Sequence, residues 1–159
     1  MSDKQAKDAA KNAAENTADE TARRVADWMY ENDPATRALG MKVEQVTPGY
    51  ARLRMKVRAD MLNGHGTCHG GMIFSLADSA FAFACNSGNT LTVAQSCDIS
   101  FVNPAREGDE LVATCEEQFQ RGRSGIYDTA VAASDGTPVA FFRGKSRTLG
   151  GALIEDTSH

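Results

Sequence analysis

Apolar side chains fill almost every helical turn between residues 70 and 86, and this run is the most hydrophobic part of the chain. Its apolar members are Met72, Ile73, Phe74, Leu76, Ala77, Ala80, Phe81, Phe83, Ala84 and Cys85. No face of such a helix is polar enough to be fully solvated, so the pattern predicts a helix buried in a core. The run is too short, and too interrupted by Ser75, Asp78 and Ser79, to span a bilayer, which takes about 20 apolar residues.

The chain before this helix is rich in alanine and in charges of both signs from residue 2 to 32, a composition that favours a helix. Residues 1–17 have almost nothing to bury, so this early part is expected to be frayed or disordered. Val25, Trp28 and Met29 follow at i, i+3 and i+4 spacing and predict one stripe that docks on the body. The proline that comes next ends the helix.

Alternation of polar and apolar residues with period two predicts strands on both sides of the buried helix. Residues 41–57 have the pattern of a hairpin around a Thr-Pro-Gly turn. After the helix, four strand-like segments follow at residues 91–102, 109–120, 124–133 and 138–149. Successive strands with short connections pair antiparallel. The predicted fold class is therefore α+β, with one bent antiparallel sheet wrapped around the central helix.

The length and composition predict one domain with one core, because the chain has 159 residues and is 42% hydrophobic. We expect this domain in residues 34–151, an N-terminal helix in residues 1–33 and a flexible polar tail in residues 152–159. Such a long buried helix in so small a chain also favours a partner subunit that covers extra apolar surface.

Charge and cysteine content narrow the possible partners and the compartment. A net charge of −4, with no run of clustered lysines and arginines, argues against nucleic-acid binding. The N-terminal segment mixes both signs of charge around a single tryptophan, which does not suggest a membrane anchor. Four cysteines lie inside expected regular elements, and the N-terminus lacks the pattern of a secretory signal. We therefore expect a cytoplasmic protein with reduced thiols.

Asp78 is the residue of the buried helix that most suggests chemistry. A carboxylate is rarely buried without a partner, and burial raises its pKa and its basicity. The structural alternative is an aspartate bonded to a neighbouring hydroxyl, such as that of Ser75 or Ser79. The environment alone leaves both interpretations open.

The loop before the helix contains His65, Cys68 and His69, whose spacing superficially resembles a metal site. Structural zinc normally takes four well-placed ligands, and no second Cys/His pair with ligand spacing follows. Cys68 has no orienting base beyond an adjacent histidine, so it is a weak candidate for a nucleophile. We expect neither a metal nor a cofactor.

Several segments between residues 28 and 151 together resemble the hotdog-fold thioesterases, and specifically their branch that acts in phenylacetate degradation. The segments are Asn63-x5-His69-Gly70-Gly71, Phe74-Ser75-Leu76-Ala77-Asp78, Ala84-Cys85-Asn86-Ser87, Met61-Leu62-Asn63-Gly64-His65, Gly125-Ile126-Tyr127-Asp128 and Phe142-Arg143-Gly144-Lys145-Ser146. The resemblance implies a hotdog fold and a homotetramer, built as a dimer of dimers, that hydrolyses acyl-CoA or aryl-CoA thioesters without a metal. The alanine-rich N-terminus is not covered.

The resemblance also implies roles in the site. Asp78 would act as general base on water or attack the carbonyl itself, and the sequence leaves both routes open. Gly70 and Gly71 open the helix, where free N–H groups stabilise negative charge, and the resemblance places the oxyanion donor at Gly70. Asn63 would orient water or the carbonyl. His69 would contact substrate or brace the loop.

The turn formed by Arg121, Gly122, Arg123, Ser124 and Gly125 is the candidate for binding the CoA phosphates. Guanidinium groups and loop amides suit phosphate oxygens, and the resembled family uses this turn. A basic solvated turn is the competing interpretation. The last strand-like segment offers further cations in Arg143, Lys145 and Arg147.

Helix geometry predicts that the site needs two chains. Gly70 and Asp78 are eight positions apart, about 12 Å along a helix axis. Reacting atoms must approach to about 3–3.5 Å, so one carbonyl cannot be served by both groups of one chain. We therefore expect an active site shared across a dimer interface, as the resemblance also implies.

The leading functional hypothesis is hydrolysis of (hydroxy)phenylacetyl-CoA type thioesters to the free acid and CoA in phenylacetate degradation. The alternatives are a general thioesterase for short- or medium-chain acyl-CoA, or a non-catalytic acyl-CoA-binding protein of the same fold. A hydratase is disfavoured, because it needs an opposed histidine and carboxylate that only His65 or His69 would supply.

Overall fold

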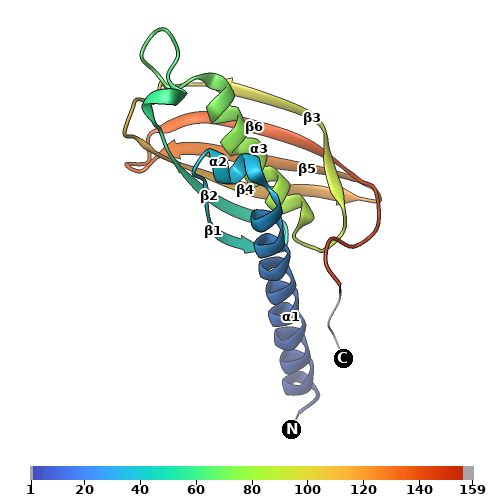
Figure 1. Ribbon diagram of the computed structural model, residues 1–159. Coiled ribbons are helices and arrows are strands. Elements are labelled where there is room, and N and C mark those ends of the chain that lie inside the picture. Colours follow the sequence, from blue (N-terminus) through green and yellow to red (C-terminus); the bar gives the residue numbers. More distant parts are fainter. Residues whose placement is uncertain (1, 156–159) are drawn as a thin grey trace.

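The central helix forms where the apolar run predicts it. The computed structural model describes residues 2–155, and in it helix α3 spans Gly70–Asn86 and lies across one face of a single sheet (Figure 1). Within α3 only Gly71 is exposed. The helix and the sheet therefore make two layers with one core between them.

Six antiparallel strands form the sheet. They are β1 (Lys42–Thr47), β2 (Tyr50–Lys56), β3 (Thr92–Phe101), β4 (Glu110–Arg121), β5 (Ser124–Ala133) and β6 (Pro138–Thr148). Their order across the sheet is β1-β2-β4-β5-β6-β3, so β1 and β3 are the two edges. All five pairings are antiparallel. The predicted hairpin, the four later strands and the α+β hotdog class are confirmed.

Aromatic side chains fasten α3 to the middle of the sheet. The ring centroid of Phe81 lies 5.5 Å from that of Tyr127 on β5 and 5.8 Å from that of Phe142 on β6. Phe74, two turns earlier, meets Phe142 edge-on at 5.5 Å. These contacts fix which face of α3 is buried, and so they also fix the face on which Asp78 lies.

The N-terminal region consists of α1 (Asp3–Asn32) and α2 (Pro34–Ala38), and a short 3₁₀ turn, η1 (Ala59–Met61), follows β2. Ala22, Val25 and Ala26 of α1 are buried against the body, whereas Trp28 is 40% exposed. The predicted docking stripe is therefore right for Val25 and wrong for Trp28, because the buried face is centred on smaller residues nearer the N-terminus.

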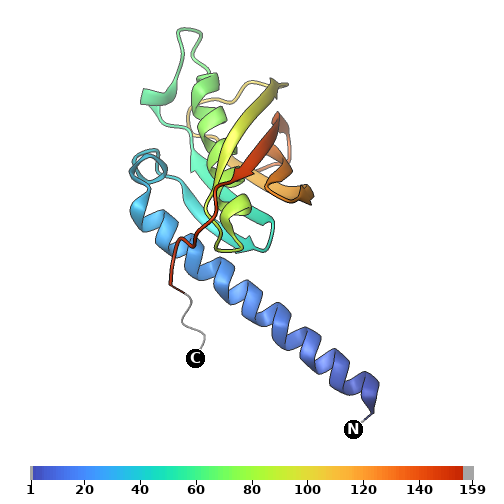
Figure 2. The ribbon, with the colours of Figure 1, turned by 90° about the vertical axis from the view of Figure 1, so that its right-hand side faces the viewer.

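The first half of α1 projects away from the body (Figure 2). Residues 2–20 are all exposed, although the helix begins with a capping box between Ser2 and Gln5. Whether this part frays in solution stays a prediction. No helix within residues 2–155 has the length and apolarity needed to cross a membrane.

The C-terminal tail is held as far as residue 155, which differs from the loose tail expected from its polarity. The side-chain oxygen of Asn89 accepts hydrogen bonds from the backbone N–H groups of Leu153 and Ile154, both at 3.0 Å. Arg24 donates to the carbonyl oxygen of Glu155 at 3.2 Å. Residues 156–159 lie outside the described residues.

A close approach between β6 and α3 yields a stability test. A Cβ atom added at Gly144 would lie 2.8 Å from the ring of Phe81. We expect Gly144→Ala to lower the free energy of unfolding by about 1–3 kcal/mol, because this core has no spare room. Urea unfolding at a fixed protein concentration measures the change.

The matched control is Gly64→Ala, whose added Cβ would meet no atom within 4 Å. This control is expected to stay within about 0.5 kcal/mol of the parent protein. Equal destabilisation by the two substitutions would contradict the close packing of β6 on α3.

Candidate active site

The N-terminus of α3 presents one free backbone donor. His69 is the N-cap, and its Nδ1 atom accepts a hydrogen bond from the N–H of Gly71 at 2.9 Å. Among the described residues no acceptor bonds the N–H of Gly70. The imidazole of His69 thus accepts a hydrogen bond from the Gly71 amide and leaves the Gly70 amide free, at the positive end of the helix dipole.

This arrangement separates the roles expected for the two glycines and the histidine. The N–H of Gly71 bonds the N-cap residue His69. Any contact of Gly71 with substrate would therefore use other atoms than this N–H. His69 braces the helix start, as one of its two predicted roles requires. Because Nδ1 of His69 accepts a hydrogen bond, the proton of its neutral ring lies on Nε2.

Asn63 lies beside Gly70 in one cavity of about 360 Å³, together with Phe101 and Val102 from the end of β3. The Asn63 side chain is largely used within its own loop. Its Oδ1 atom accepts from the N–H groups of His65 (2.9 Å) and Thr67 (3.2 Å). Its Nδ2 atom donates to the Thr67 hydroxyl at 3.0 Å, which leaves one N–H for a ligand.

A side chain at Gly70 would have to displace the ring of Phe101. A Cβ atom there would lie 3.0 Å from the ring of Phe101, which is itself 51% exposed. The absence of a side chain thus keeps the backbone of Gly70 close to an apolar surface that is open on its other side. This contact supports a requirement for glycine that goes beyond a tight turn.

Asp78 is half-buried in the middle of α3 and faces β3. Its one hydrogen-bond donor among the described residues is the Cys97 thiol, whose Sγ atom lies 3.9 Å from Oδ1. Burial raises the pKa of Asp78, and the Cys97 contact partly opposes this effect. A carboxyl group with a raised pKa and few partners is a suitable general base.

The structural alternative for Asp78 fails, because both neighbouring hydroxyls have other partners. Ser75 donates to the carbonyl oxygen of Gly71 at 2.8 Å. The Ser79 hydroxyl bonds the Thr36 hydroxyl at 3.2 Å, at the start of α2. Neither serine therefore satisfies the carboxylate.

Gly70 and Asp78 lie on one uninterrupted helix, so they stay about 12 Å apart along its axis. The cavity that contains Gly70 and Asn63 is not lined by Asp78. The Gly70 amide and the Asp78 carboxylate of a single chain thus cannot act on the same substrate carbonyl.

The turn between β4 and β5 lies at the opposite end of α3. Gly122 lines a cavity there with Ser87 and Gly88, the residues that follow α3. Arg123 is exposed, and its Nε atom donates to the carbonyl oxygen of Thr148 at 2.8 Å. Gly125 is buried beneath neighbouring side chains, so its predicted contact with CoA has no surface from which to form.

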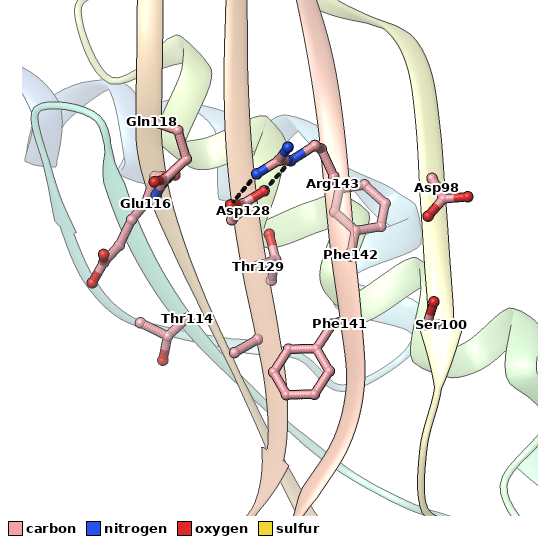
Figure 3. A pocket seen from close by; sticks show the side chains of 11 residues that line it. Asp98, Ser100, Thr114, Glu116, Gln118, Asp128, Thr129, Phe141, Phe142 and Arg143 are labelled. Carbon is pink, nitrogen blue, oxygen red and sulfur yellow. Dashed lines mark hydrogen bonds and ion pairs between the residues drawn. The ribbon is translucent and has the colours of Figure 1, made fainter.

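Another hollow contains none of the residues expected to do the chemistry, but Arg143 lines it. It measures about 580 Å³ and lies on the outer face of the sheet, opposite α3 (Figure 3). Its charged centre is already neutralised, because Arg143 binds Asp128 through two hydrogen bonds of 2.6 and 2.7 Å. Arg143 is therefore a poor candidate for the phosphate site.

The described side chains that could bind a metal ion are not clustered. Across residues 2–155, no three His, Cys, Asp or Glu side chains form a group that could hold a metal ion. Cys68 is buried, and burial raises the pKa of its thiol, which disfavours a nucleophilic thiolate. The expectation of no metal and no cofactor stays a prediction.

Two residues beside the candidate site were missed by the sequence. Cys97 reaches Asp78, and Phe101 lies over Gly70. Both are on β3, where alternation shows only which residues share a face. Their contacts with α3 form because the chain crosses from the end of α3 to the far edge of the sheet, where β3 lies.

Known proteins resemble this chain in sequence over most of its length. The sequence profile of the Thioesterase superfamily matches residues 65–140. The acyl-coenzyme A thioesterase PaaI of Escherichia coli is 46% identical over 125 residues, which is 79% of this chain and 89% of that protein. A putative esterase of Archaeoglobus fulgidus is 38% identical over 121 residues, 76% of this chain and 79% of that protein.

Solved structures give the same relationship. The E. coli PaaI protein from the phenylacetic acid degradation operon superposes with a TM-score of 0.84 at 44% identity, covering 86% of this chain and 99% of that one. The TT0310 protein of Thermus thermophilus gives a TM-score of 0.71 at 41% identity, covering 74% and 98%. The chain therefore belongs to the Thioesterase superfamily of hotdog-fold enzymes, which hydrolyse thioesters.

Proposed function

We propose that this protein is an acyl-CoA thioesterase that hydrolyses (hydroxy)phenylacetyl-CoA type thioesters to the free acid and CoA, in phenylacetate degradation. The observation that carries the proposal is the half-buried Asp78, eight residues from the free Gly70 amide on the same helix. The similarity to a protein named acyl-coenzyme A thioesterase PaaI, from a phenylacetic acid degradation operon, supports a phenylacetyl-CoA type thioester as the substrate.

The chemistry needs few groups, because a thiol leaves easily. Its pKa is about 8.5 in a free cysteine and similar in CoA, so no strong general acid is required. Asp78 activates water, or attacks the carbonyl itself, and the Gly70 amide stabilises the oxyanion that forms. The remaining N–H of Asn63 donates to the water or the carbonyl oxygen.

A second copy of the chain completes this site in our proposal. Strand β3 is a ten-residue edge strand, and an edge of that length is a template for pairing with another chain. Large apolar side chains are exposed along it and beside it: Leu91, Val93, Phe101 and Val102. Pairing there would bring the partner's Gly70 region toward Asp78 and cover this apolar surface.

Further features of the proposal follow from the same chemistry. Arg121 and Arg123 are exposed on the turn at the C-terminal end of α3. The guanidinium group of Arg121, and the N–H groups of Arg123 that do not bond the carbonyl oxygens of Thr148 and Leu149, are available to CoA phosphates. Two such dimers would associate into the homotetramer that the family resemblance implies. All four cysteines are free, which fits a reducing cytoplasm.

A panel of purified CoA thioesters tests the substrate class. We expect phenylacetyl-CoA and its ring-hydroxylated forms to give higher kcat/KM than aliphatic acyl-CoA of short or medium length. A preference for aliphatic esters would replace the proposed substrate with a general one, and binding without turnover would make the protein a carrier or sensor.

Asp78→Asn is expected to reduce kcat by at least about 100-fold, because it removes the base with almost no change in volume. Steady-state assays of arylacetyl-CoA hydrolysis measure the loss. Retained CoA-ester binding and an unchanged thermal unfolding midpoint serve as controls for folding. An enzyme that keeps the parent kcat after this substitution would remove Asp78 from the reaction.

The pH profile tests the state of the same carboxyl group. Asp78 acts only when ionised, and burial raises its pKa above the ordinary value of 3.8. Activity is therefore expected to fall, as pH is lowered, at a pH higher than an ordinary aspartate would give.

Cys97 variants should move this acidic limb in opposite directions. Cys97→Val removes the donor that lowers the Asp78 pKa, so the limb should shift to higher pH. Cys97→Ser supplies a better donor and should shift it to lower pH. Identical limbs in the two variants would show that Cys97 does not act on Asp78.

A further inference from the structure

The cavity that contains Gly70 has an apolar wall that the chemistry above does not use. One turn further along α3, Ile73 lines this wall, and Phe101 and Val102 line it at the end of β3. The volume of about 360 Å³ lies at the small end of the range for ligand pockets. The free Gly70 amide and the apolar wall therefore belong to one small space.

Backbone hydrogen bonds hold the two sides of this cavity at a fixed separation. The N–H of Cys68, in the loop before α3, donates to the carbonyl oxygen of Ala105 at 2.8 Å. The N–H of Val102 donates to the carbonyl oxygen of Val139 on β6 at 2.9 Å. The segment after β3 is thus bonded both to the loop and to the sheet, and the cavity is formed before any ligand enters.

Phe101 is the largest apolar side chain of the wall, and it is only partly covered. The edge of its ring would lie 3.0 Å from a Cβ atom at Gly70, whereas 51% of the residue is exposed. Val102 beside it is 47% exposed. A ligand that covers this surface gains the free energy of removing it from water.

Strand β3 runs alongside α3 from Asp78 to Gly70 (Figure 1). The Cys97 thiol contacts Asp78 at one end of this stretch, and the Phe101 ring lies over Gly70 at the other end. Four residues of a strand and eight residues of a helix each span about 12–13 Å, so one regular alignment gives both contacts. Phe101 therefore lies at the amide half of the site.

We propose that the ring of Phe101 contacts the aromatic ring of the acyl group and thereby makes the enzyme prefer arylacetyl groups to saturated ones. The inference rests on the proposed function and names a residue that selects its substrate. In an arylacetyl group a single methylene separates the carbonyl from the ring. When the carbonyl oxygen accepts a hydrogen bond from the Gly70 amide, the ring lies against the side chains around Gly70, and Phe101 is the aromatic one that lines this cavity.

A contact between two aromatic rings distinguishes an aromatic acyl group from a saturated one of the same size. Aromatic rings attract each other in offset or edge-to-face arrangements, beyond the effect of the area they bury. A saturated ring buries a similar area but has no π system for this contact. Ile73 and Val102 contact both kinds of ring alike, so the discrimination comes from Phe101.

The proposed dimer keeps Phe101 at the shared site. Two β3 strands that pair antiparallel about a two-fold axis near Ile99 place Phe101 of one chain opposite the partner's Cys97. Within each chain Cys97 contacts Asp78. In this register the Phe101 ring, the Gly70 amide and the partner's Asp78 surround one acyl group.

Phe101→Leu tests the inference with phenylacetyl-CoA and cyclohexylacetyl-CoA, which differ in the aromaticity of the ring. The substitution keeps an apolar side chain and removes the aromatic one. We expect the ratio of kcat/KM for phenylacetyl-CoA to that for cyclohexylacetyl-CoA to fall about three- to tenfold. Phe101→Tyr keeps the aromatic ring, so its ratio should stay within about twofold of the parent value.

Phe141→Leu is the matched control. Phe141 is 53% exposed and lies on β6, the strand next to β3, but on the outer face of the sheet (Figure 3). Its substitution should leave the ratio unchanged. Sizing and thermal unfolding check that each variant keeps the assembly and the fold of the parent.

An unchanged ratio in folded Phe101→Leu, or an equal fall in Phe141→Leu, would overturn the inference and leave the thioesterase proposal standing. The parent enzyme gives a second test that needs no variant, because it should prefer phenylacetyl-CoA to cyclohexylacetyl-CoA. Equal kcat/KM values for the two esters would also overturn the inference. A parent enzyme that hydrolyses neither ester would overturn the proposed function and the inference with it.

Discussion

The rigidity of α3 is the constraint on which the candidate site depends. One unbroken helix carries both the free Gly70 amide and the Asp78 carboxyl group, and it holds them about 12 Å apart. Packing of Phe81 and Phe74 on the sheet prevents the helix from bending to bring them together. In the proposed mechanism these two groups therefore meet between chains, which would make oligomerisation part of the catalytic chemistry.

The same packing determines the electrostatics of Asp78. Because the apolar face of α3 packs on the middle of the sheet, the side chain of Asp78 points toward the edge strand β3. There it is half-buried. Partial burial raises its pKa, while Ser75 and Ser79 are bonded elsewhere. The residues that stabilise the fold thus also keep the carboxyl group basic and short of partners.

The sequence predicted the features that follow from local periodicity and missed those that depend on contacts across the sheet. The limits of α3, the hairpin and the isolation of Asp78 within an apolar helix follow from residue patterns. The contact of Cys97 with Asp78 depends on β3 crossing to the far edge beside β6. The exposure of Trp28 and the burial of Gly125 depend on which neighbours arrive from distant segments. Pattern analysis has no access to such neighbours.

The most direct test of a site formed by two chains is complementation between two inactive variants. Gly70→Pro removes the donor at a position where proline suits a helix start, and the half-exposed Phe101 ring has room to move aside. Refolded in equal amounts with Asp78→Asn, it should form mixed dimers as about half of the population, each with one intact site. We predict recovery of about a quarter of the parent activity, with neither variant active alone. If both variants fold and associate by circular dichroism and sizing, yet the mixture stays inactive, Gly70 and Asp78 do not share a site.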